Sequence, residues 1–258
     1  MASSIGDKIE PLARVGYAAR GIIYLIVGGL ALLAAVGQGG RTTGSKGALT
    51  SLMSQPFGQV MLGIVAAGLV GYSVWRFVQA VWDADGHGTD LKGWLVRGGL
   101  LVSAGTHAAL AFFCASILFG IGGGGSKSYV AWLLGLPMGQ WLVAAVRVAV
   151  IGAGVANIVK GVTAKYKKRF DMDRQGMRWA APLCTFGLVA RGVAFLIVGG
   201  LIIAAGVQVE PDKAQGLAAA LDALHRQPYG PYLLGTLALG LLAFGLYSGI
   251  AAVFRRIG

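Results

Sequence analysis

Long runs of apolar residues alternate with short polar connections along the chain. Six of these runs are long enough to cross the hydrocarbon core of a bilayer, which takes about 20 residues in a helix. They cover residues 15–37, 58–82, 94–120, 139–163, 183–208 and 231–254. The period-two alternation of a membrane barrel strand is absent, and a helix satisfies its own backbone hydrogen bonds inside lipid. The pattern therefore predicts an all-α membrane protein with six transmembrane helices.

Two stretches of the chain repeat each other closely. Residues 19–30 read Ala-Arg-Gly-Ile-Ile-Tyr-Leu-Ile-Val-Gly-Gly-Leu, and residues 190–201 read Ala-Arg-Gly-Val-Ala-Phe-Leu-Ile-Val-Gly-Gly-Leu. Each is followed further along by the phrase Gln-Pro-aromatic-Gly, at 55–58 and at 227–230. The repeating unit is therefore two hydrophobic segments joined by a connection.

The middle pair of segments is a weaker copy of this unit. Residues 97–99 correspond to 14–16, and residues 136–139 correspond to the Gln-Pro-aromatic-Gly phrase, while Ala104 replaces the repeated arginine. We expect a single membrane domain, 1–258, with repeats at 12–82, 94–163 and 183–254. Each repeat has two spans, so all three hairpins point the same way and are related by an axis along the membrane normal. The expected architecture is a pseudo-threefold bundle of three parallel two-helix hairpins.

The connections between paired spans share a style. Residues 47–54 and 217–224 place leucines three or four apart, which predicts short helices lying on the membrane interface. The third such connection, 129–136, carries Tyr129 and Trp132, residue types that are common in aromatic belts. Residues 1–14 are polar and predict a surface tail.

Positive charge is distributed unevenly between the two sides of the predicted spans. We assign 16 of the 22 Lys and Arg residues to the side of the N-terminus, five to the other side, and Arg147 to neither. Cytoplasmic flanks carry the excess of Lys and Arg, so both termini are expected in the cytoplasm. The net charge of +12 comes from these flanks and not from one basic domain, so we expect no nucleic-acid partner.

The densest basic run lies between the fourth and fifth spans. It contains Lys165, Lys167, Lys168 and Arg169. Such a run attracts anionic lipid headgroups at roughly 1 kcal/mol per basic residue. We expect an orientation anchor here or, as the alternative, a lipid-regulated surface. Membrane lipids are the expected partners, and a protein partner remains an open alternative.

Acidic residues stay outside the predicted spans, whereas a few other polar residues enter them. None of the ten Asp and Glu residues lies within a span, which argues against a carboxylate proton relay. Arg147 lies within the fourth span, and Ser103 and His107 share one stripe of the third. These three predict a polar contact point for an anion or polar solute. A neutral hydrogen-bonded histidine and a snorkelling arginine are the alternative.

Arginines also recur just inside the predicted cytoplasmic boundary. Arg20 and Arg191 occupy equivalent positions in the first and third repeats, and Arg76 is similarly placed near the end of the second span. They would either line a vestibule or reach lipid phosphate.

Signals of catalysis are poor. Ser103 and His107 resemble a nucleophile and a base in residue type alone, because no orienting third group or oxyanion site can be named. The sequence has no Gly-rich phosphate loop, HExxH or CxxC motif, and residues 83–88 lack the ligand spacing of a calcium loop. We expect no enzyme, no cofactor and no metal site.

The repeated phrases also carry a family resemblance. Residues 14–24, residues 47–49 with 55–58, and their counterparts in the third hairpin resemble the bacterial integral membrane proteins catalogued as domain of unknown function 1206. The resemblance covers nearly the whole chain, strongly in hairpins one and three and more weakly in two. It implies a bacterial inner-membrane protein of three two-helix repeats and brings no activity, substrate or catalytic residue with it.

Two function classes follow from these observations. The first is a small channel or transporter for an anion or polar solute along the pseudo-threefold axis, with Arg147 and His107 as polar contacts. The second is a structural or lipid-binding membrane protein that stabilises or regulates a partner. A water-accessible cavity reaching Arg147 would favour the first, and an axis filled by apolar side chains would favour the second.

Overall fold

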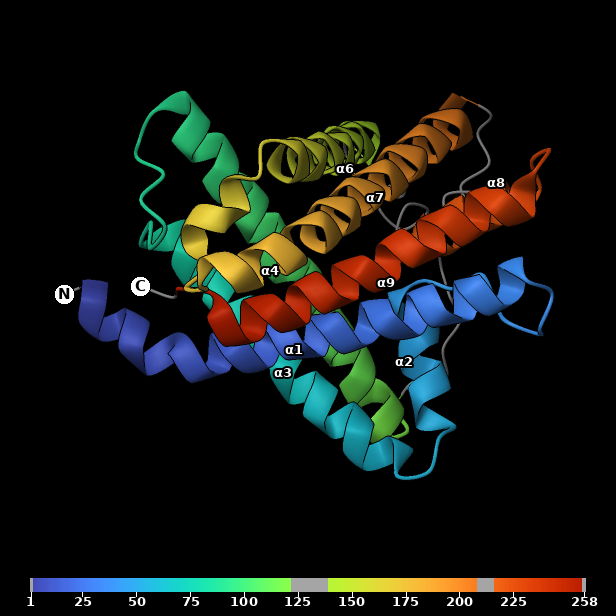
Figure 1. Ribbon diagram of the computed structural model, residues 1–258, viewed down its shortest axis with the longest axis horizontal. Coiled ribbons are helices and arrows are strands. Elements are labelled where there is room, and N and C mark those ends of the chain that lie inside the picture. The colour runs from blue at the N-terminus through green and yellow to red at the C-terminus, as the bar shows by residue number, and fades with distance from the viewer. Residues whose placement is uncertain (1, 122–138, 208–215, 257–258) are drawn as a thin grey trace.

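The computed structural model describes residues 2–121, 139–207 and 216–256, and their regular structure is helical. Figure 1 shows the helices in chain order. Long helices are α1 (Ala2–Ala35), α3 (Gly58–Val81), α4 (Leu91–Leu118), α6 (Gly139–Val162), α7 (Arg174–Val207) and α9 (Gly230–Phe254); short ones are α2 (Ser45–Met53), α8 (Gly216–His225) and the 3-10 helix η1 (Lys165–Arg169). The all-α prediction is therefore confirmed for the described residues.

Among the described residues, five helices are long and apolar enough to cross a membrane: Ala13–Ala35, Gly58–Val81, Leu91–Leu118, Arg174–Leu201 and Gly230–Phe254. The sixth span, predicted at 139–163, coincides with α6 but is not among these five, so it stays a prediction. The expected surface tail at 1–14 is helical from Ala2, where α1 begins, while the candidate span within α1 begins at Ala13. Likewise α7 begins at Arg174, ahead of the expected 183, and continues through Pro182.

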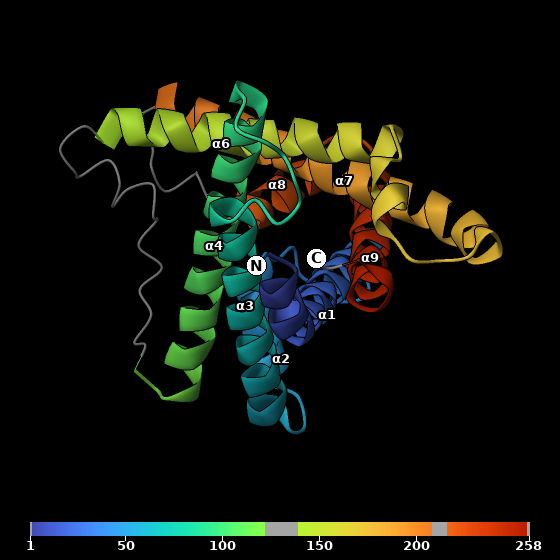
Figure 2. The same ribbon diagram turned by 90° about the vertical axis from the view of Figure 1, so that its left-hand side faces the viewer.

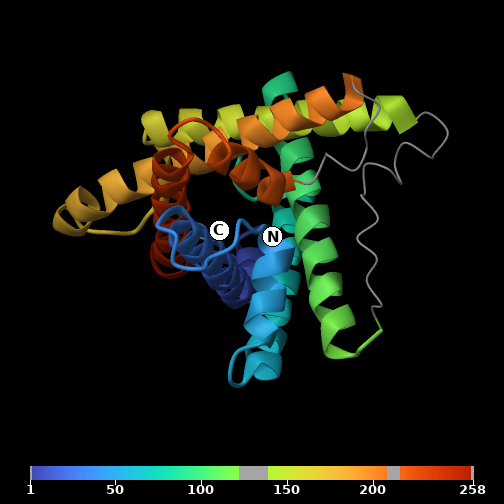
Figure 3. The ribbon, with the colours of Figure 1, turned by 90° about the vertical axis from the view of Figure 1, so that its right-hand side faces the viewer.

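The long helices pack mainly as three pairs: α1 along α9, α3 along α4, and α6 along α7. Further contacts join α1 to α3 and α7 to α9. Figure 2 and Figure 3 show α3 and α4 running side by side, across the direction of α6 and α7. Both ends of the described chain and η1 lie toward one end of the molecule, and α2 and α8 lie toward the other (Figure 1).

Glycines set the closest helix contacts in repeats one and three. Tyr72 on α3 sits on Gly16 of α1, where an added Cβ would come within 2.5 Å of the tyrosine Cβ. At Gly187 of α7 an added Cβ would come within 2.4 Å of the backbone nitrogen of Phe244 on α9. Such contacts bring the helix backbones together where water cannot drive association. The two hairpins are therefore built alike.

The middle repeat does not form this hairpin, because α4 and α6 barely touch. The expectation of three equivalent hairpins is corrected here, and the sequence supplies a physical reason. Tyr72 and Phe244 each follow the glycine of the Pro-x-Gly turn by 14 residues, and the corresponding residue after Gly139 is Ala153. Alanine lacks the aromatic ring that both strong repeats carry at this position.

The Gln-Pro-aromatic-Gly phrase forms the same turn in both strong repeats. Phe57 and Tyr229 adopt left-handed backbone conformations, with φ of 60° and 62°. The amides of Gly58 and Gly230 donate to the carbonyls of Gln55 and Gln227, at 2.9 and 2.8 Å. A Cβ at either glycine would collide with carbonyl oxygens of the preceding short helix, so both positions require glycine. The short helices α2 and α8 confirm the two predicted connecting helices.

Candidate functional site

Arg20 lies in the interior, with a side chain only 5% exposed. Its Nε donates to Ser248 Oγ on α9 at 3.2 Å, and its Nη1 donates to the hydroxyl of Tyr72 on α3. The guanidinium also lies about 5 Å from the ring centres of Tyr17, Tyr72 and Phe244. An arginine so enclosed is held by hydroxyl groups and aromatic faces from three helices.

Arg76 approaches the same tyrosine from α3 itself. Its Nε donates to Tyr72 Oη at 2.8 Å, and its Nη1 donates to Gln79 Oε1 at 3.1 Å. The phenol oxygen of Tyr72 therefore accepts hydrogen bonds from two guanidinium groups, those of Arg20 and Arg76. These bonds satisfy donors of both arginines and bring two positive charges to one phenol oxygen.

Arg191 on α7 brings a third guanidinium to these rings. Its Nε donates to Tyr24 Oη at 2.9 Å, and its Nη1 donates to Asn157 Oδ1 at 3.1 Å. It lies 4.6 Å from the ring centre of Phe244, the ring that Arg20 also faces. The equivalent arginines of repeats one and three thus share one aromatic side chain.

Two further cations complete the arrangement. Lys160 on α6 lies 5.5 Å from the ring centre of Tyr247, and Arg255, at the end of α9, lies 5.2 Å from that of Tyr17. We call the whole set the cation–aromatic cluster: the cations Arg20, Arg76, Lys160, Arg191 and Arg255, and the aromatic residues Tyr17, Tyr24, Tyr72, Phe244 and Tyr247. It joins helices α1, α3, α6, α7 and α9.

Asp85 connects this cluster to the surface. It accepts from Arg255 Nη2 at 3.3 Å and from Gln79 Nε2 at 2.7 Å, and it pairs with Arg169 Nη1 of η1 at 2.5 Å. Burial alone would raise the pKa of Asp85, but the positive charges of Arg255 and Arg169 outweigh it and hold the pKa below its ordinary value. A continuous path of polar contacts therefore runs from Asp85 through Gln79 and Arg76 to Tyr72.

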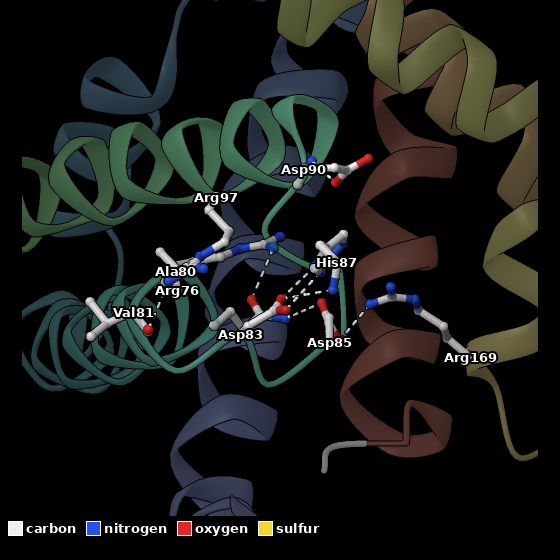
Figure 4. Close-up of polar contacts among 12 residues, drawn as sticks. Arg76, Ala80, Val81, Asp83, Asp85, His87, Asp90, Arg97 and Arg169 are labelled. Carbon is white, nitrogen blue, oxygen red and sulfur yellow. Dashed lines mark hydrogen bonds and ion pairs between the residues drawn. The ribbon is translucent and has the colours of Figure 1, made fainter.

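The loop that carries Asp85 is held by hydrogen bonds to its backbone (Figure 4). Asp83 accepts from the amides of His87 and Gly88 at 2.7 and 2.8 Å, which lowers the pKa of its carboxyl group. Asp90 caps α4, and Arg97 donates to the last carbonyls of α3, those of Ala80 and Val81. These hydrogen bonds fix the conformation of the loop. The described residues hold no group of three or more His, Cys, Asp or Glu side chains suited to a metal.

The charges of the cluster do not balance. Within the part of the chain that the structure describes, Asp85 is the one carboxylate bonded to any of the five cations, and it is shared with Arg169. A buried charge without a counter-charge costs several kcal/mol. Tyr17 Oη, Trp75 Nε1 and Arg255 Nε are also buried without a hydrogen-bond partner. The cations of the cluster therefore outnumber the carboxylates bonded to them.

Of the polar spot predicted in repeat two, His107 alone reaches the cluster. Its ring lies 4.5 Å from that of Tyr72, and its Nδ1 donates to the Ser103 carbonyl at 2.7 Å. A carbonyl can only accept, so Nδ1 carries the proton in this pose. Arg147 is on α6, which barely touches α4, and its Nε is buried without a partner. The structure therefore does not bring His107 and Arg147 together as one contact point.

The other predicted sites are placed as follows. Arg20, Arg76 and Arg191 all turn inward to hydroxyl and amide groups, and their predicted role at a vestibule or at lipid phosphate stays a prediction. Lys165, Lys167 and Lys168 are exposed on η1, whereas Arg169 is occupied by Asp85. Burial raises the pKa of Tyr166 in the same helix, which donates to the Ala181 carbonyl at 2.8 Å.

Several residues of the cluster were not expected from the sequence. Tyr72, Phe244 and Lys160 belong to it, and Ser248 and Asp85 bond to two of its cations, Arg20 and Arg255. One signal was available, since Gln79, Asn157 and Ser248 are polar residues within apolar runs. Polar groups at such depth need partners, which makes them markers of interior contacts.

The fold and the cluster define an all-helical, multi-pass membrane protein built from repeated pairs of helices. The model of the family described as Domain of Unknown Function (DUF1206) matches residues 15–83, 98–164 and 186–255. The chain belongs to this family. It is also similar to an uncharacterised protein, YxxB, of Bacillus subtilis (strain 168), with 32% identity over 254 residues that cover 96% of this chain and 92% of that protein. No solved structure matches it.

Proposed function

We propose that the chain crosses the bacterial inner membrane six times, with both termini in the cytoplasm and the three repeats around a pseudo-threefold axis. The order of helix packing supports this arrangement. Each repeat's second helix packs along the first helix of the next repeat: α3 along α4, α6 along α7, and α9 along α1. The positive-inside rule supports the orientation, since the basic η1 lies at the same end as both termini.

Our proposal for its activity is a small channel or transporter for an anion or polar solute along that axis. The excess of positive charge in the cation–aromatic cluster carries the proposal, because helices of all three repeats contribute to it. Positively charged groups at membrane depth are typical of pathways for anions. Asp85 and its two arginines would close the cytoplasmic mouth in this state. The proposal includes no catalytic step, cofactor or nucleic-acid partner.

A structural or lipid-binding protein is the second candidate, and a different observation favours it. Aromatic side chains fill the cluster, and Trp75, Tyr17, Tyr72, Phe244 and Tyr247 are all almost completely buried. One surface cavity formed by described residues lies between η1 and α7 and another lies beside residues 37–43, and Arg147 lines neither of these two. A filled interior of this kind would suit a protein that stabilises a partner and conducts nothing.

Flux into proteoliposomes separates the two candidates. We expect wild-type protein to carry chloride, phosphate or a small organic anion faster than empty liposomes, and Arg76→Gln and Arg147→Gln to lose at least most of this flux. The matched control is Arg226→Gln, which removes an exposed arginine paired with Asp222 at 2.9 Å. It should retain the flux. Equal thermal stability of all variants excludes misfolding as the cause.

Absence of wild-type flux for every solute tested would overturn the transport proposal and leave the structural candidate. Flux that persists in both arginine variants would place any pathway away from these charges.

A further inference from the structure

A surface groove separate from the cation–aromatic cluster lies between η1, the segment that follows it, and α7. Its volume is about 1050 Å³. The lining residues are Lys167, Phe170, Met172, Asp173, Arg174, Met177, Arg178, Ala181, Pro182, Thr185, Phe186 and Val189. Those on α7 recur at spacings of three and four, so they share one face of this helix. Between positions 174 and 189 the face extends about 22 Å, at 1.5 Å per residue.

The groove is charged at one end and apolar along the rest. Lys167, Arg174 and Arg178 lie at the end where α7 begins. Their side chains make no hydrogen bond or ion pair within the described part of the chain. The one acid in the lining, Asp173, uses its carboxylate to accept from the amide of Gly176 at 2.9 Å, which caps α7. The charged end therefore presents free cations to an anion.

Apolar side chains line the continuation of the groove along α7. Pro182 and Phe186 are exposed, and Val189 is half-buried. The one hydroxyl in this part, that of Thr185, is bonded to Tyr166 Oη at 2.9 Å. A molecule bound in this part of the groove would therefore contact mainly apolar side chains.

The change from charged to apolar falls at the level expected for a membrane surface. Trp179, next to Arg178, is 81% exposed, and tryptophans of this kind gather where headgroups meet hydrocarbon. The opposite wall of the groove is fixed to the end of α9, since the Asp171 amide donates to the Phe254 carbonyl at 2.7 Å and the Arg256 amide to the Arg169 carbonyl at 2.9 Å. The groove is thus preformed at headgroup depth.

We propose that this groove binds one anionic phospholipid. Its phosphate would lie against Lys167, Arg174 and Arg178, and an acyl chain would follow Pro182, Phe186 and Val189 into the membrane. Charge complementarity and the polar-to-apolar order along α7 both fit a lipid and not a free anion or a peptide. The site is independent of the transport proposal, because none of its residues belongs to the cation–aromatic cluster.

Native mass spectrometry of the full chain tests the site. The protein is released from detergent micelles containing phosphatidylglycerol and phosphatidylcholine with identical acyl chains. We expect wild-type protein to retain one phosphatidylglycerol at least severalfold over phosphatidylcholine, and the double variant Arg174→Gln/Arg178→Gln to lose this preference. A second variant, Ala181→Phe, keeps every charge but fills the groove, and it should lose the bound lipid as well.

The matched control is Lys165→Gln/Lys168→Gln, which removes the same charge from exposed positions of η1 that do not line the groove. It should retain the preference. If this control lost the phosphatidylglycerol preference while the groove variants retained it, the groove would not be the site. Lipid binding would then be assigned to the η1 surface. A different result would be that inorganic phosphate displaces the phosphatidylglycerol while Ala181→Phe still binds it. That result would overturn the role of the acyl chain. No phosphatidylglycerol preference in wild-type protein would also overturn the site, whatever the flux assay shows.

Discussion

At the scale of single residues, two aromatic positions and two arginines organise the interior. Arg20 and Arg191 are equivalent in repeats one and three, yet they find different partners: Ser248 for one and Asn157 for the other. Both face the ring of Phe244, which therefore links the two repeats. The repeat preserves the cation while the surrounding helices supply different acceptors.

The turn glycines give the first prediction. Gly58→Ala and Gly230→Ala should each destabilise the protein by about 1–3 kcal/mol, the range for overpacking, because the new Cβ would collide with carbonyl oxygens of α2 or α8. Thermal unfolding in detergent measures the loss. Gly63→Ala is the control, since a Cβ there meets nothing within 4 Å. If Gly58→Ala proved as stable as Gly63→Ala, the turn geometry described here would be wrong.

Asp85 gives a prediction about pH. Its folded-state pKa is lowered, so its contribution to stability is complete above the ordinary carboxyl pKa of about 3.9 and is lost as the pH falls through the lower folded-state value. Asp85→Asn should lower stability at pH 7 by about 3 kcal/mol, because it leaves buried Arg255 unpaired, and should remove this part of the acid sensitivity.

Thermal unfolding from pH 7 down to pH 3 checks the prediction. Asp171→Asn is the control, because its pair with Arg256 is exposed on both sides and contributes little. Equal stability of the two variants at pH 7 would mean that the Asp85 pairs do not hold this end of the protein.

At the scale of elements, the difference between the hairpins depends on where small residues meet large ones. Gly187→Ala should cost about 1–3 kcal/mol, because its Cβ would strike the backbone of Phe244. Gly99, which corresponds to Gly16 in the weaker repeat, has nothing within 4 Å of an added Cβ. Gly99→Ala should therefore be neutral or slightly stabilising in the same unfolding measurement. A large loss in Gly99→Ala would indicate that α4 has a neighbour beyond those described.

The sequence predicted the helices because their signal is local, since apolar runs mark the spans. The Gln-Pro-aromatic-Gly phrase identified the repeat, and the structure adds that it forms the same turn in both copies. The contact of Arg20 with Ser248 could not be predicted, because these residues are 228 positions apart in the sequence. Whether they meet depends on how α1 and α9 are rotated about their axes. The missing α4–α6 hairpin was overlooked for a related reason. An apolar run predicts a span with Ala153 at this position as readily as with an aromatic residue, although the two side chains differ in volume.

At the scale of the whole molecule, the ends of the long helices sort into two groups, which predicts membrane sidedness. In intact spheroplasts a membrane-impermeant maleimide should label Gln38→Cys, and should label Lys168→Cys only after permeabilisation. Both positions are exposed, and the native Cys114 and Cys184 are buried and should stay unreactive. The reverse pattern would invert the orientation. Labelling of both from outside would contradict the arrangement of the hairpins.

The packing of α1 along α9 has a consequence for how the protein is made. The first of the described helices has its most extensive contact with the last, so this contact has the longest separation along the chain. During synthesis α1 enters the membrane while Ser248 and Phe244 have not yet left the ribosome. Until they arrive, the guanidinium of Arg20 lacks two of its partners within the membrane. The nascent chain must therefore keep that charge near the water or in contact with another protein, which makes α1 the segment most dependent on assistance during insertion.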